Sequence, residues 1–457
     1  MRTNLDNIKG ARVLIVGLGK SGIAAAQAMI RLGADVSIQD GKREDQLDPS
    51  LLAFFAGKGV TGWFDKVPED MSAYDLLILS PGVSPELPFI QEAKEAGAEV
   101  IGELEIAYRV GRGNYVAITG TNGKTTTTTL TGEIFQAAGR RTSVVGNIGV
   151  AVISAALDAK PEDWLVTEVS SFQLETTRYF KPQISAILNL TPDHLNRHHT
   201  MEAYGAAKAK VFANQTQEGY LILNQDDPAC FALGKEATCR IVPFSRKEKL
   251  PFGAYVDHDQ IVVADGNGVH PICATGDIGL PGAHNLENVL AAAAISYFAG
   301  IEPAVIQKAI AGFGGVEHRI EYCGQMNGVR YYNDSKGTNT DATITAIHAL
   351  EKNLILIAGG DGKGQDFAPL AKAFPGAVKK LLLLGRDGQI IGKAAQEAGF
   401  QELEYGKDMD ACVRRAWELA EPGDVVLLSP ACASWDMYDN FEQRGNHFKE
   451  CVHRLGV

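Results

Sequence analysis

The 457-residue sequence has little of what marks several large classes of protein. Its seven cysteines include no Cys-x-x-Cys pair, which argues against a zinc site or a disulfide framework and favours a reducing, cytoplasmic setting. No apolar run reaches the roughly 18 residues of a membrane span, and residues 1–9 lack the apolar core of a secretory signal. With 43 basic and 55 acidic residues the net charge is −12, which disfavours sequence-independent binding to nucleic acid.

What is present is the composition of an ordinary globular protein, with 45% hydrophobic and 21% charged residues. Strand-like and helix-like segments alternate in three blocks, separated near Gly111–Gly113 and Gly314–Gly315. This alternation predicts an α/β fold with parallel sheets and three domains, at residues 1–111, 112–314 and 315–457. Nothing in the sequence requires an oligomer. The expected strands are Val13–Gly17, Val36–Asp40, Asp75–Ser80, Tyr115–Thr119, Trp164–Val169, Ile184–Leu190, Val329–Asn333, Leu354–Ala358, Leu381–Leu384 and Val425–Leu428.

A glycine-rich turn after the strand Tyr115–Thr119 indicates a phosphate-binding loop. Backbone N–H groups in such a turn point at phosphate oxygens at a helix N-terminus, with Lys124 at the terminal phosphates and the Thr125 hydroxyl at Mg²⁺. Ile118 stands where the usual first glycine would be, and a plain turn opening a helix is the alternative. The turn and the start of the helix comprise Gly120, Thr121, Asn122, Gly123, Lys124, Thr125 and Thr126.

Polar residues after two further strands of the central block are candidate metal ligands. Glu168 ends the apolar run Trp164–Thr167, and Asp193-His194 comes just after the strand at Ile184–Leu190. Singly, each is typical of a solvated strand end. Because ligands gather beyond the carboxyl ends of parallel strands, Thr125, Glu168 and His194 together predict a magnesium site.

Lys208 lies on the apolar face of a predicted helix. At about 100° per residue, Tyr204, Ala207 and Val211 share a stripe that includes Lys208, whereas Lys210 points away. The side chain either lies along apolar surface with its amine in water, or its amine is desolvated with a lowered pKa. A neutral amine reacts with CO₂ to give a carbamate, which is an anionic metal ligand, but periodicity does not decide between these alternatives.

The first and third blocks also carry turns at strand ends. Gly17-Leu18-Gly19-Lys20-Ser21-Gly22, with Asp40 at the end of the next strand, matches a dinucleotide fingerprint, although any tight strand–helix turn can use this pattern. Ser80-Pro81-Gly82 adds a second turn. In the third block Lys336, Lys363 and Ser434 suit a small carboxylate-bearing substrate, with an ordinary loop as the alternative for each segment, and Arg319 suits nucleotide phosphates.

In this order the motifs resemble the Mur ligase family over essentially the whole chain. The segments that carry the resemblance are Gly17–Gly22, Gly120–Thr126, Glu168–Glu175, Asp193-His194, Ala206–Lys208, His284–Asn288, His318-Arg319, Asn333–Lys336 and Ser429–Ser434. Asn333–Asn339 and Ser434–Gly445 are the segments most similar to the D-glutamate-adding members. The resemblance implies a Rossmann-like UDP-binding N-terminal domain, a central P-loop-type ATPase domain and a Rossmann-like C-terminal domain that binds the amino acid.

The resemblance also implies the chemistry and its residues. ATP would activate the alanine carboxylate of UDP-N-acetylmuramoyl-L-alanine as an acyl phosphate, which the amine of D-glutamate would attack. Lys124, Lys208 and His194 would be catalytic, with one Mg²⁺ at Thr125 and Glu168 and a second at His194 and a carbamylated Lys208. ATP would also contact Asn288, Arg319 and Asp334. The UDP-sugar would contact Lys20, Ser21, Asp40, Ser80, Gly82, Asn147 and His194. D-Glutamate would contact Thr338, Lys363, Ser434, Trp435 and Phe441.

Lys20, Gly41-Lys42 and Trp435 depart from the residues expected at their positions. Among the rivals, a nicotinamide dehydrogenase would explain only the first block, and a simple NTPase or kinase only the second. A folylpolyglutamate-type ligase shares the overall plan but is not expected to have this glycine turn in a uridine-binding block. A non-catalytic nucleotide-binding scaffold is the remaining alternative.

Overall fold

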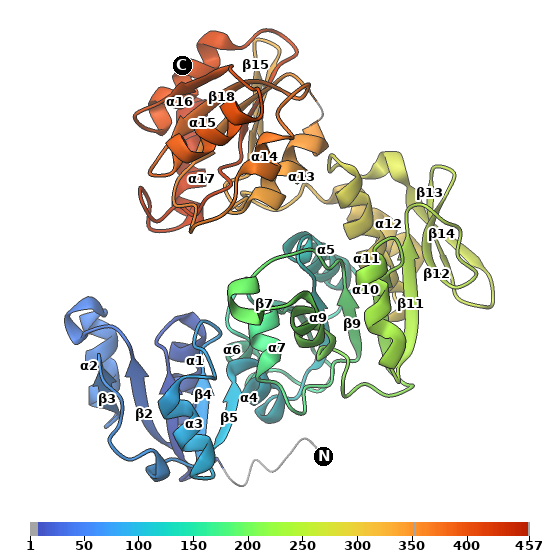
Figure 1. Ribbon diagram of the computed structural model, residues 1–457. Coiled ribbons are helices and arrows are strands. Elements are labelled where there is room, and N and C mark those ends of the chain that lie inside the picture. Colours follow the sequence, from blue (N-terminus) through green and yellow to red (C-terminus); the bar gives the residue numbers. More distant parts are fainter. Residues whose placement is uncertain (1–7, 351, 456–457) are drawn as a thin grey trace. The chain divides into compact units, whose positions relative to one another are not determined.

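The computed structural model describes residues 8–350 and 352–455, whose strands form three sheets (Figure 1). The chain divides into two compact units. Unit 1 comprises residues up to 277 together with 287–311, and unit 2 comprises 278–286 together with the chain from 312 onward. Two of the sheets belong to unit 1 and the third to unit 2. The domain boundaries at residues 111 and 314 stay a prediction.

The first sheet is parallel throughout, with strand order β3-β2-β1-β4-β5. Alternate residues of β1 face opposite sides: Val13 and Ile15 enter one apolar cluster, and Leu14 and Val16 another. Both faces are therefore covered, as in a doubly wound Rossmann-like sheet. Its elements are β1 (Arg12–Val16), α1 (Lys20–Arg31), β2 (Asp35–Asp40), α2 (Pro49–Gly57), β3 (Thr61–Phe64), β4 (Leu76–Leu79), α3 (Pro88–Glu95), β5 (Glu99–Gly102) and α4 (Glu103–Val110).

The second sheet has the strand order β14-β13-β12-β11-β10-β9-β6-β8-β7. It is parallel from β7 to β12 and ends in an antiparallel meander, β12-β13-β14. Its strands are β6 (Asn114–Thr119), β7 (Thr142–Gly146), β8 (Trp164–Glu168), β9 (Ile184–Ile187), β10 (Tyr220–Asn224), β11 (Arg240–Ser245), β12 (Gly253–Asp257), β13 (Gln260–Ala264) and β14 (Val269–Ala274). The accompanying helices are α5 (Lys124–Ala137), α6 (Val152–Ala156), α7 (Ser171–Glu175), α8 (Leu195–His198), α9 (Met201–Ala209), α10 (Pro228–Ala232), α11 (Ala283–Phe298) and α12 (Pro303–Gly312).

The third sheet, in unit 2, has the strand order β15-β16-β20-β17-β18-β19, and only β15 is antiparallel to its neighbour. Leu354 and Leu356 of β17 enter one apolar cluster while Ile355 and Ile357 enter the other, so helices cover both faces. The elements are β15 (Glu321–Met326), β16 (Val329–Asn333), α13 (Thr340–Leu350), β17 (Leu354–Gly359), α14 (Ala368–Ala371), β18 (Val378–Leu384), α15 (Gly388–Glu397), β19 (Leu403–Tyr405), α16 (Met409–Leu419), β20 (Val425–Leu428) and α17 (Phe441–Arg454).

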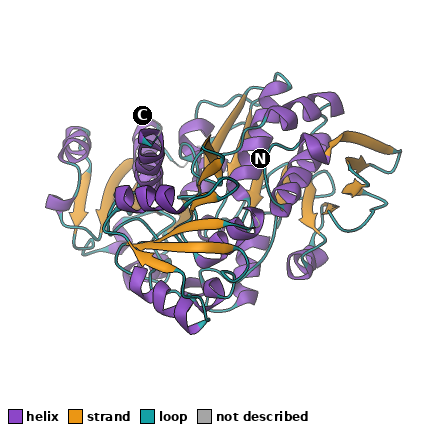
Figure 2. Ribbon diagram, turned by 90° about the horizontal axis from the view of Figure 1, so that it is seen from above, coloured by secondary structure: helices purple, strands orange, loops and turns teal. Residues whose placement is uncertain are grey.

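The predicted α/β class is confirmed, since helices and strands occur together throughout the described chain (Figure 2). Each of the ten predicted strands is present within a few residues of its expected bounds. The run at Ile184–Leu190 contains a shorter strand: the N–H of Leu188 still bonds Thr119, the last residue of β6, whereas Asn189 bonds Thr121 in the turn that follows. The expectation of purely parallel sheets was wrong for β13, β14 and β15. These strands connect to their neighbours by short turns, which antiparallel pairs allow.

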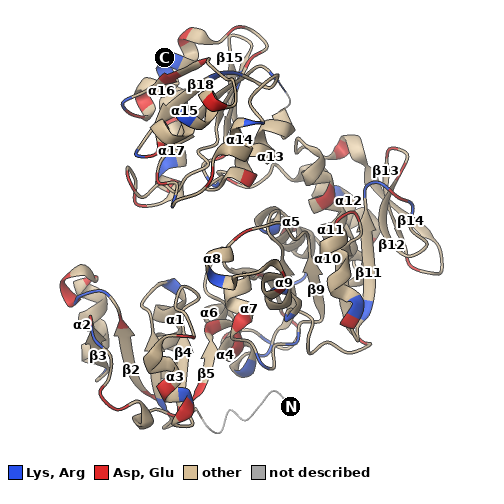
Figure 3. Ribbon diagram, in the orientation of Figure 1, with Lys and Arg blue, Asp and Glu red and all other residues tan. Residues whose placement is uncertain are grey.

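Charged residues lie mainly on helices and loops, and the inner strands are almost free of them (Figure 3). The seven cysteines are free thiols, six of them buried. Within the described ranges no helix is both long and apolar enough to cross a membrane.

Glu103, the first residue of α4, links this helix to α6 in the central part of unit 1. Its side chain is buried, and Oε1 accepts a 2.6 Å hydrogen bond from the N–H of Ile153 in α6. Oε2 is also buried and finds no partner among the described residues. Burial raises the pKa of this carboxyl to about 7.

Replacing Glu103 by Gln should therefore make the protein's stability less dependent on pH. The pKa of Glu103 is higher in the folded than in the unfolded chain. The folding stability that protonated Glu103 contributes is therefore complete below about pH 4.5 and is lost as pH rises towards 7. Between pH 5 and pH 8 wild type should lose roughly 2–3 kcal/mol relative to Glu103→Gln. Urea unfolding of both proteins at the two pH values measures this difference. Parallel changes in the two proteins would contradict the assignment.

Candidate active site

The turn between β6 and α5 has the geometry of an anion cradle. Gly120 and Gly123 have φ angles of +151° and +81°, which a residue with a side chain adopts only with strain. Gly123 is the N-cap of the 14-residue helix α5, whose first turn has no acidic residue. The positive end of the helix dipole, with no acidic residue in the first turn, thus favours a negatively charged group.

Asn189 holds this turn in shape from the end of β9. Its Oδ1 accepts hydrogen bonds from the N–H groups of Thr121 and Asn122, at 3.0 and 2.8 Å. Its Nδ2 donates to the carbonyl of Asn122 at 3.1 Å. Asn189 was not among the residues predicted from the sequence, although its position at the end of a predicted strand was the available signal.

Lys124 and Lys208 converge on one oxygen atom. The Nζ atoms of both lysines donate to the carbonyl of Gly120, each at 2.8 Å. Lys124 also donates to the carbonyl of Thr121 at 2.8 Å. Two ammonium groups sharing one acceptor repel each other, so the arrangement favours an anion between them or loss of one proton.

Lys208 is the group that this environment favours in its neutral form. It is 1% exposed in α9, and its Nζ lies 4.4 Å from the ring centre of Tyr204. Burial, and after it the charge of Lys124, place the pKa of Lys208 well below its usual value. Of the two alternatives left open by the sequence, the structure supports the desolvated amine. Lys210 donates instead to the carbonyl of Glu175, on another side of the helix.

Glu168 lies at the end of β8, the neighbour of β6, and is 1% exposed. Its Oε1 accepts a 2.8 Å hydrogen bond from Nδ2 of Asn147. Its Oε2 is buried with no hydrogen-bond partner in the described part of the chain. A buried carboxylate oxygen without a hydrogen bond destabilises the folded state unless a cation or a hydrogen-bond donor binds to it. Thr125, 4% exposed, is on the adjacent helix start.

His194 precedes α8 in the left-handed conformation, with φ +53°. Its ring centre lies 4.8 Å from that of Phe172, and Phe172 also stacks on His198, with 5.4 Å between the ring centres. His198 is itself held by Ser171, with 2.9 Å between Nε2 and Oγ. The aromatic stack thus fixes one side of the His194 imidazole, while about half of that side chain stays exposed.

The candidate residues of the first sheet gather around its glycine turn. Asp40 accepts from the N–H of Leu18 at 2.7 Å, and Ser80 donates to the carbonyl of Gly17 at 2.7 Å. Lys20 begins α1 and donates to the carbonyl of Gly149, two residues from the Asn147 that bonds Glu168. Ser21 follows in α1, and Gly82 lies in the turn after β4.

Asn288 is adjacent to the cradle. A Cβ on Gly123 would overlap Oδ1 of Asn288, and the same oxygen lies 3.4 Å from the hydroxyl of Thr127. Asn288 belongs to α11 in unit 1, as the cradle does. The other two predicted ATP contacts, Arg319 and Asp334, belong to unit 2.

Asp334 follows β16 and is 3% exposed. It accepts from the Ser429 hydroxyl at 2.7 Å and from the N–H of Ile320 at 3.3 Å. Burial raises its pKa to about 6, against the nearby charge of Arg319. Arg319 Nε is buried and has no hydrogen-bond partner in the described ranges.

Unit 2 also brings together the residues predicted for D-glutamate. Nζ of Lys363 lies 4.9 Å from the ring centre of Trp435, which is 66% exposed, while the neighbouring Ser434 is buried. The loops that carry them are paired, because Asp361 and Ala433 exchange backbone hydrogen bonds of 3.0 and 2.8 Å. Phe441 meets the ring of His318 edge to face at 6.0 Å, and Thr338 follows Lys336, whose Nζ lies 5.4 Å from the Phe441 ring.

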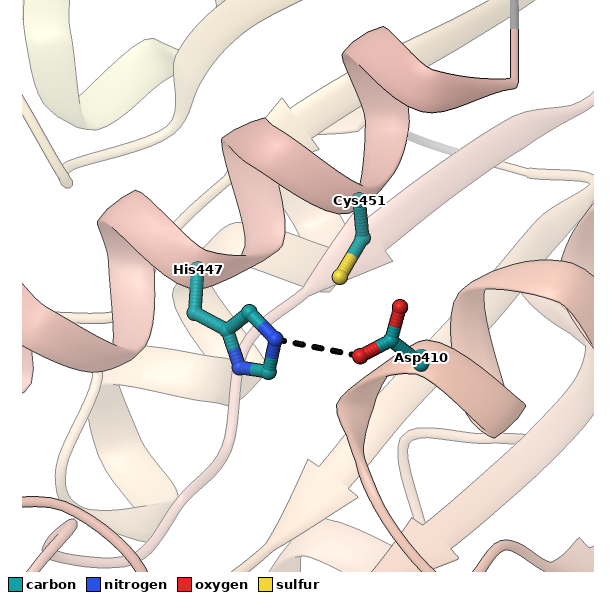
Figure 4. A group of neighbouring side chains, drawn as sticks. All are labelled: Asp410, His447 and Cys451. Atoms are coloured by element: carbon teal, nitrogen blue, oxygen red, sulfur yellow. Dashed lines mark hydrogen bonds and ion pairs between the residues drawn. The ribbon is translucent and has the colours of Figure 1, made fainter.

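A further polar group, Asp410, His447 and Cys451, joins α16 to α17 in unit 2 (Figure 4). The three ligand atoms lie within 4.8 Å of one another, and His447 Nε2 is 3.1 Å from Asp410 Oδ2. Arg454 already supplies a cation here, since it donates to Asp410 at 2.9 Å and to the sulfur of Cys451 at 3.2 Å. Burial also raises the pKa of the thiol to about 11. The group is therefore best interpreted as a structural ion-pair network.

Three family models match the chain. Residues 11–102 match the MurD-like N-terminal domain of Mur ligases, residues 118–296 the Mur ligase middle domain, and residues 318–432 the glutamate ligase domain of Mur ligases. Each match contains one of the three sheets or most of it.

Curated relatives match over nearly full length. A UDP-N-acetylmuramoylalanine--D-glutamate ligase of Caldanaerobacter subterraneus is 46% identical over 449 residues, covering 97% of this chain and 98% of the relative. The ligase of the same name from Clostridioides difficile is 45% identical over 450 residues, covering 98% of this chain and 100% of the relative.

Solved structures share the fold at low sequence identity. A pseudomurein peptide ligase type C from Methanothermus fervidus has a TM-score of 0.59 at 17% identity, covering 97% of this chain and 100% of that chain. A UDP-N-acetylmuramate-alanine ligase from Thermotoga maritima has a TM-score of 0.59 at 18% identity, with the same coverage.

Gly123→Ala should weaken ATP binding at least about tenfold, because the added Cβ would push Asn288 away and distort the cradle. Gly139→Ala is the matched control: Gly139 follows the other end of α5 with φ +73°, and no atom lies within 4 Å of the position that its Cβ would take. Both variants should lose about 1–2 kcal/mol from left-handed strain alone. Calorimetric titration with ATP and thermal unfolding separate the two effects. Equal ATP affinities in the two variants would refute a special role for Gly123.

Proposed function

The chain belongs to the Mur ligase family, and we propose that the groups around the Gly120 carbonyl are its site of phosphoryl transfer. It is an ATP-dependent ligase that adds D-glutamate to UDP-N-acetylmuramoyl-L-alanine, in peptidoglycan precursor synthesis. The convergence of Lys124 and Lys208 on one carbonyl oxygen, beside the left-handed Gly123, is the observation that carries the proposal.

In this proposal the central part of unit 1 is a P-loop-type ATPase domain. Gly120, Thr121, Asn122, Gly123, Lys124, Thr125 and Thr126 form the cradle, and Asn288 borders it. A carboxylate oxygen of the alanyl group attacks the γ-phosphorus of ATP, and the bond to the bridging oxygen breaks to release ADP. Lys124 stabilises the charge that builds up on the transferred phosphoryl group.

The second step forms the amide. The uncharged amine of D-glutamate attacks the carbonyl carbon of the acyl phosphate, inorganic phosphate leaves, and the nitrogen loses a proton. Lys363, Thr338, Ser434, Trp435 and Phe441 bind D-glutamate, and the ammonium of Lys363 and the buried Ser434 hydroxyl match its carboxylates. Arg319 and Asp334 complete the nucleotide contacts, with Asp334 at the ribose.

The donor set fits magnesium. Glu168 offers an unsatisfied buried oxygen and Thr125 a hydroxyl, which are the hard oxygen ligands that Mg²⁺ prefers. We place a second ion at His194 and at Lys208 in carbamylated form. Bound Mg²⁺ would neutralise charge on the phosphate oxygens.

A carbamate on Lys208 follows from the chemistry of its surroundings. The lone pair of the neutral amine forms a bond to the carbon of CO₂, one C=O π pair moves to oxygen, and the nitrogen loses a proton. The product carries a negative charge beside Lys124, so a repulsive pair of cations becomes an attractive pair. Burial and the charge of Lys124 lower the pKa of Lys208, which favours the neutral amine that this reaction requires.

The first sheet binds the UDP end of the sugar substrate. Lys20 and Ser21 begin α1, where the helix dipole favours the diphosphate. Asp40 and Ser80 hold the glycine turn, and Gly82 lets the substrate approach the turn after β4. Asn147 and His194 contact the central part of the sugar substrate. Because Asn147 also bonds Glu168, the sugar contact and the metal ligand are coupled.

Phosphate release should depend on ATP, Mg²⁺, UDP-N-acetylmuramoyl-L-alanine and D-glutamate together. L-Glutamate and D-aspartate, at the same concentration, should release phosphate at least about a hundredfold more slowly, because the mirror-image or shortened acid leaves a buried polar group of the site unpaired. A coupled phosphate assay with mass spectrometry of the product measures both points. Release that is indifferent to the amino acid would overturn the assignment.

Lys208→Ala should abolish activity, with kcat lowered at least about a thousandfold, and millimolar acetate or formate should restore part of it by taking the place of the carbamate. Lys210→Ala is the control, since its amine bonds the carbonyl of Glu175 instead; it should keep most activity and show no response to the acid. Full activity in unrescued Lys208→Ala would reject the carbamate.

A further inference from the structure

The first turn of α17 contains an arginine, Arg444, whose side chain is buried. Asn440 caps the helix by accepting from the N–H of Gln443 at 2.7 Å, and Arg444 follows one turn after Phe441. Arg444 is only 3% exposed. Burial lowers its pKa to about 10, so it remains charged at neutral pH. A buried charge of this kind must be compensated by hydrogen bonds.

The guanidinium of Arg444 bonds two separate loops. Nε donates to the hydroxyl of Ser335 at 3.0 Å, and Nη2 donates to the carbonyls of Ser335 and Cys432 at 2.9 and 3.0 Å. The Ser335 hydroxyl in turn donates to the carbonyl of Phe441 at 2.8 Å. One side chain therefore connects the segment after β16, the segment after β20 and the start of α17.

A fourth segment lies beside the same side chain. Nη1 of Arg444 is buried without a hydrogen-bond partner in the described chain, and it lies 3.3 Å from the ideal Cβ position of Gly360. Gly360 has φ +133° and begins the loop that leads to Lys363. All four segments that carry the proposed D-glutamate contacts thus border Arg444, and Arg444 itself is buried from solvent.

Gly445, the next residue, shows that the start of α17 packs closely against its neighbours. A Cβ there would overlap Nδ1 of His318 and lie 3.0 Å from Nδ2 of Asn333. These two side chains are bonded to each other at 2.9 Å. The absence of a side chain at Gly445 lets the helix approach closely enough for Arg444 to reach both loops.

We propose that Arg444 is a positioning residue for the D-glutamate site, holding the loops that bear Thr338, Lys363 and Ser434 in register with Phe441. The role rests on the proposed function, because these residues are assigned to D-glutamate there. Thr338 is three residues from Ser335, and Ser434 is two residues from Cys432, so small shifts at the arginine reach the substrate contacts directly. The planar fork of arginine spans two loops at once, which a single ammonium cannot do.

The test compares Arg444→Met and Arg444→Lys in the full-length enzyme. Both should raise the KM for D-glutamate at least about tenfold, with the larger change in Arg444→Met, because a lysine keeps the charge but bonds only one loop. The KM for UDP-N-acetylmuramoyl-L-alanine should stay within about twofold, since its proposed contacts lie in unit 1. A general loss of folded enzyme would lower the rate without this selective change in KM.

Arg454→Met and Arg454→Lys are the matched controls, because Arg454 lies on the same helix but is largely exposed and paired with Asp410. Both should leave the KM for D-glutamate unchanged. Gly445→Ala provides an independent variant that retains Arg444 but displaces the helix, and it should raise the KM for D-glutamate in the same way.

If Arg444→Met or Arg444→Lys keeps the wild-type KM for D-glutamate, or if the KM values of both substrates rise together, the positioning role is refuted. A wild-type enzyme that does not respond to D-glutamate would refute the proposed function instead. The two failures are distinguishable because the first appears only in the variants and the second already in wild type.

Discussion

The direction of parallel strands determines where most candidate residues of this protein lie. In a parallel sheet all carboxyl ends meet at one edge, so residues far apart in sequence become neighbours there. In the central sheet the adjacent strands β9, β6 and β8 end next to Asn189, Gly120 and Glu168. In the first sheet β2, β1 and β4 end at Asp40, Gly17 and Ser80. The same directionality thus assembles two chemically different sites.

The loops at these edges are tied to one another by buried polar side chains. Asp40 bonds the turn after β1, Asn189 the turn after β6, and Ser429 bonds Asp334 across neighbouring strand ends. Such bonds contribute about 1–3 kcal/mol each when one partner is charged, and losing one partner leaves the other buried and unpaired. The sites are therefore shaped as much by side chains that touch no ligand as by those proposed to bind one.

Local patterns in the sequence were sufficient for the strands and for the glycine turns. The apolar runs that became β6, β8 and β17 are buried on both faces, and a continuous run is what such a position requires. The meander of β12 to β14 was missed because β12 and β14 mix apolar with polar residues, and Pro271 lies inside β14. The degree to which a side chain is buried was harder to predict than the helix face on which it lies. Periodicity placed Lys208 on the inner face of its helix, but its burial depends on Tyr204 and the Gly120 carbonyl.

The burial of Arg444 had no signal in its local sequence, because its partners Ser335 and Cys432 lie in other segments of the chain. Asn189 and Glu168 differ in this respect, since both lie at the ends of apolar runs that mark strands. Trp435 was assigned by resemblance alone, and its exposure shows that a bulky side chain fits there without entering the interior.

The division of the chain into units has a consequence for how the protein is made. Residues 278–286 belong to unit 2, yet they lead into α11, most of which belongs to unit 1. Leu280 lies beside Gly315, and Gly282 beside Ala349, within unit 2. During synthesis this short segment leaves the ribosome well before its partners, so unit 2 cannot complete its packing until the last third of the chain has emerged. For the same reason, a fragment that begins at residue 312 would lack a segment that packs against it in unit 2.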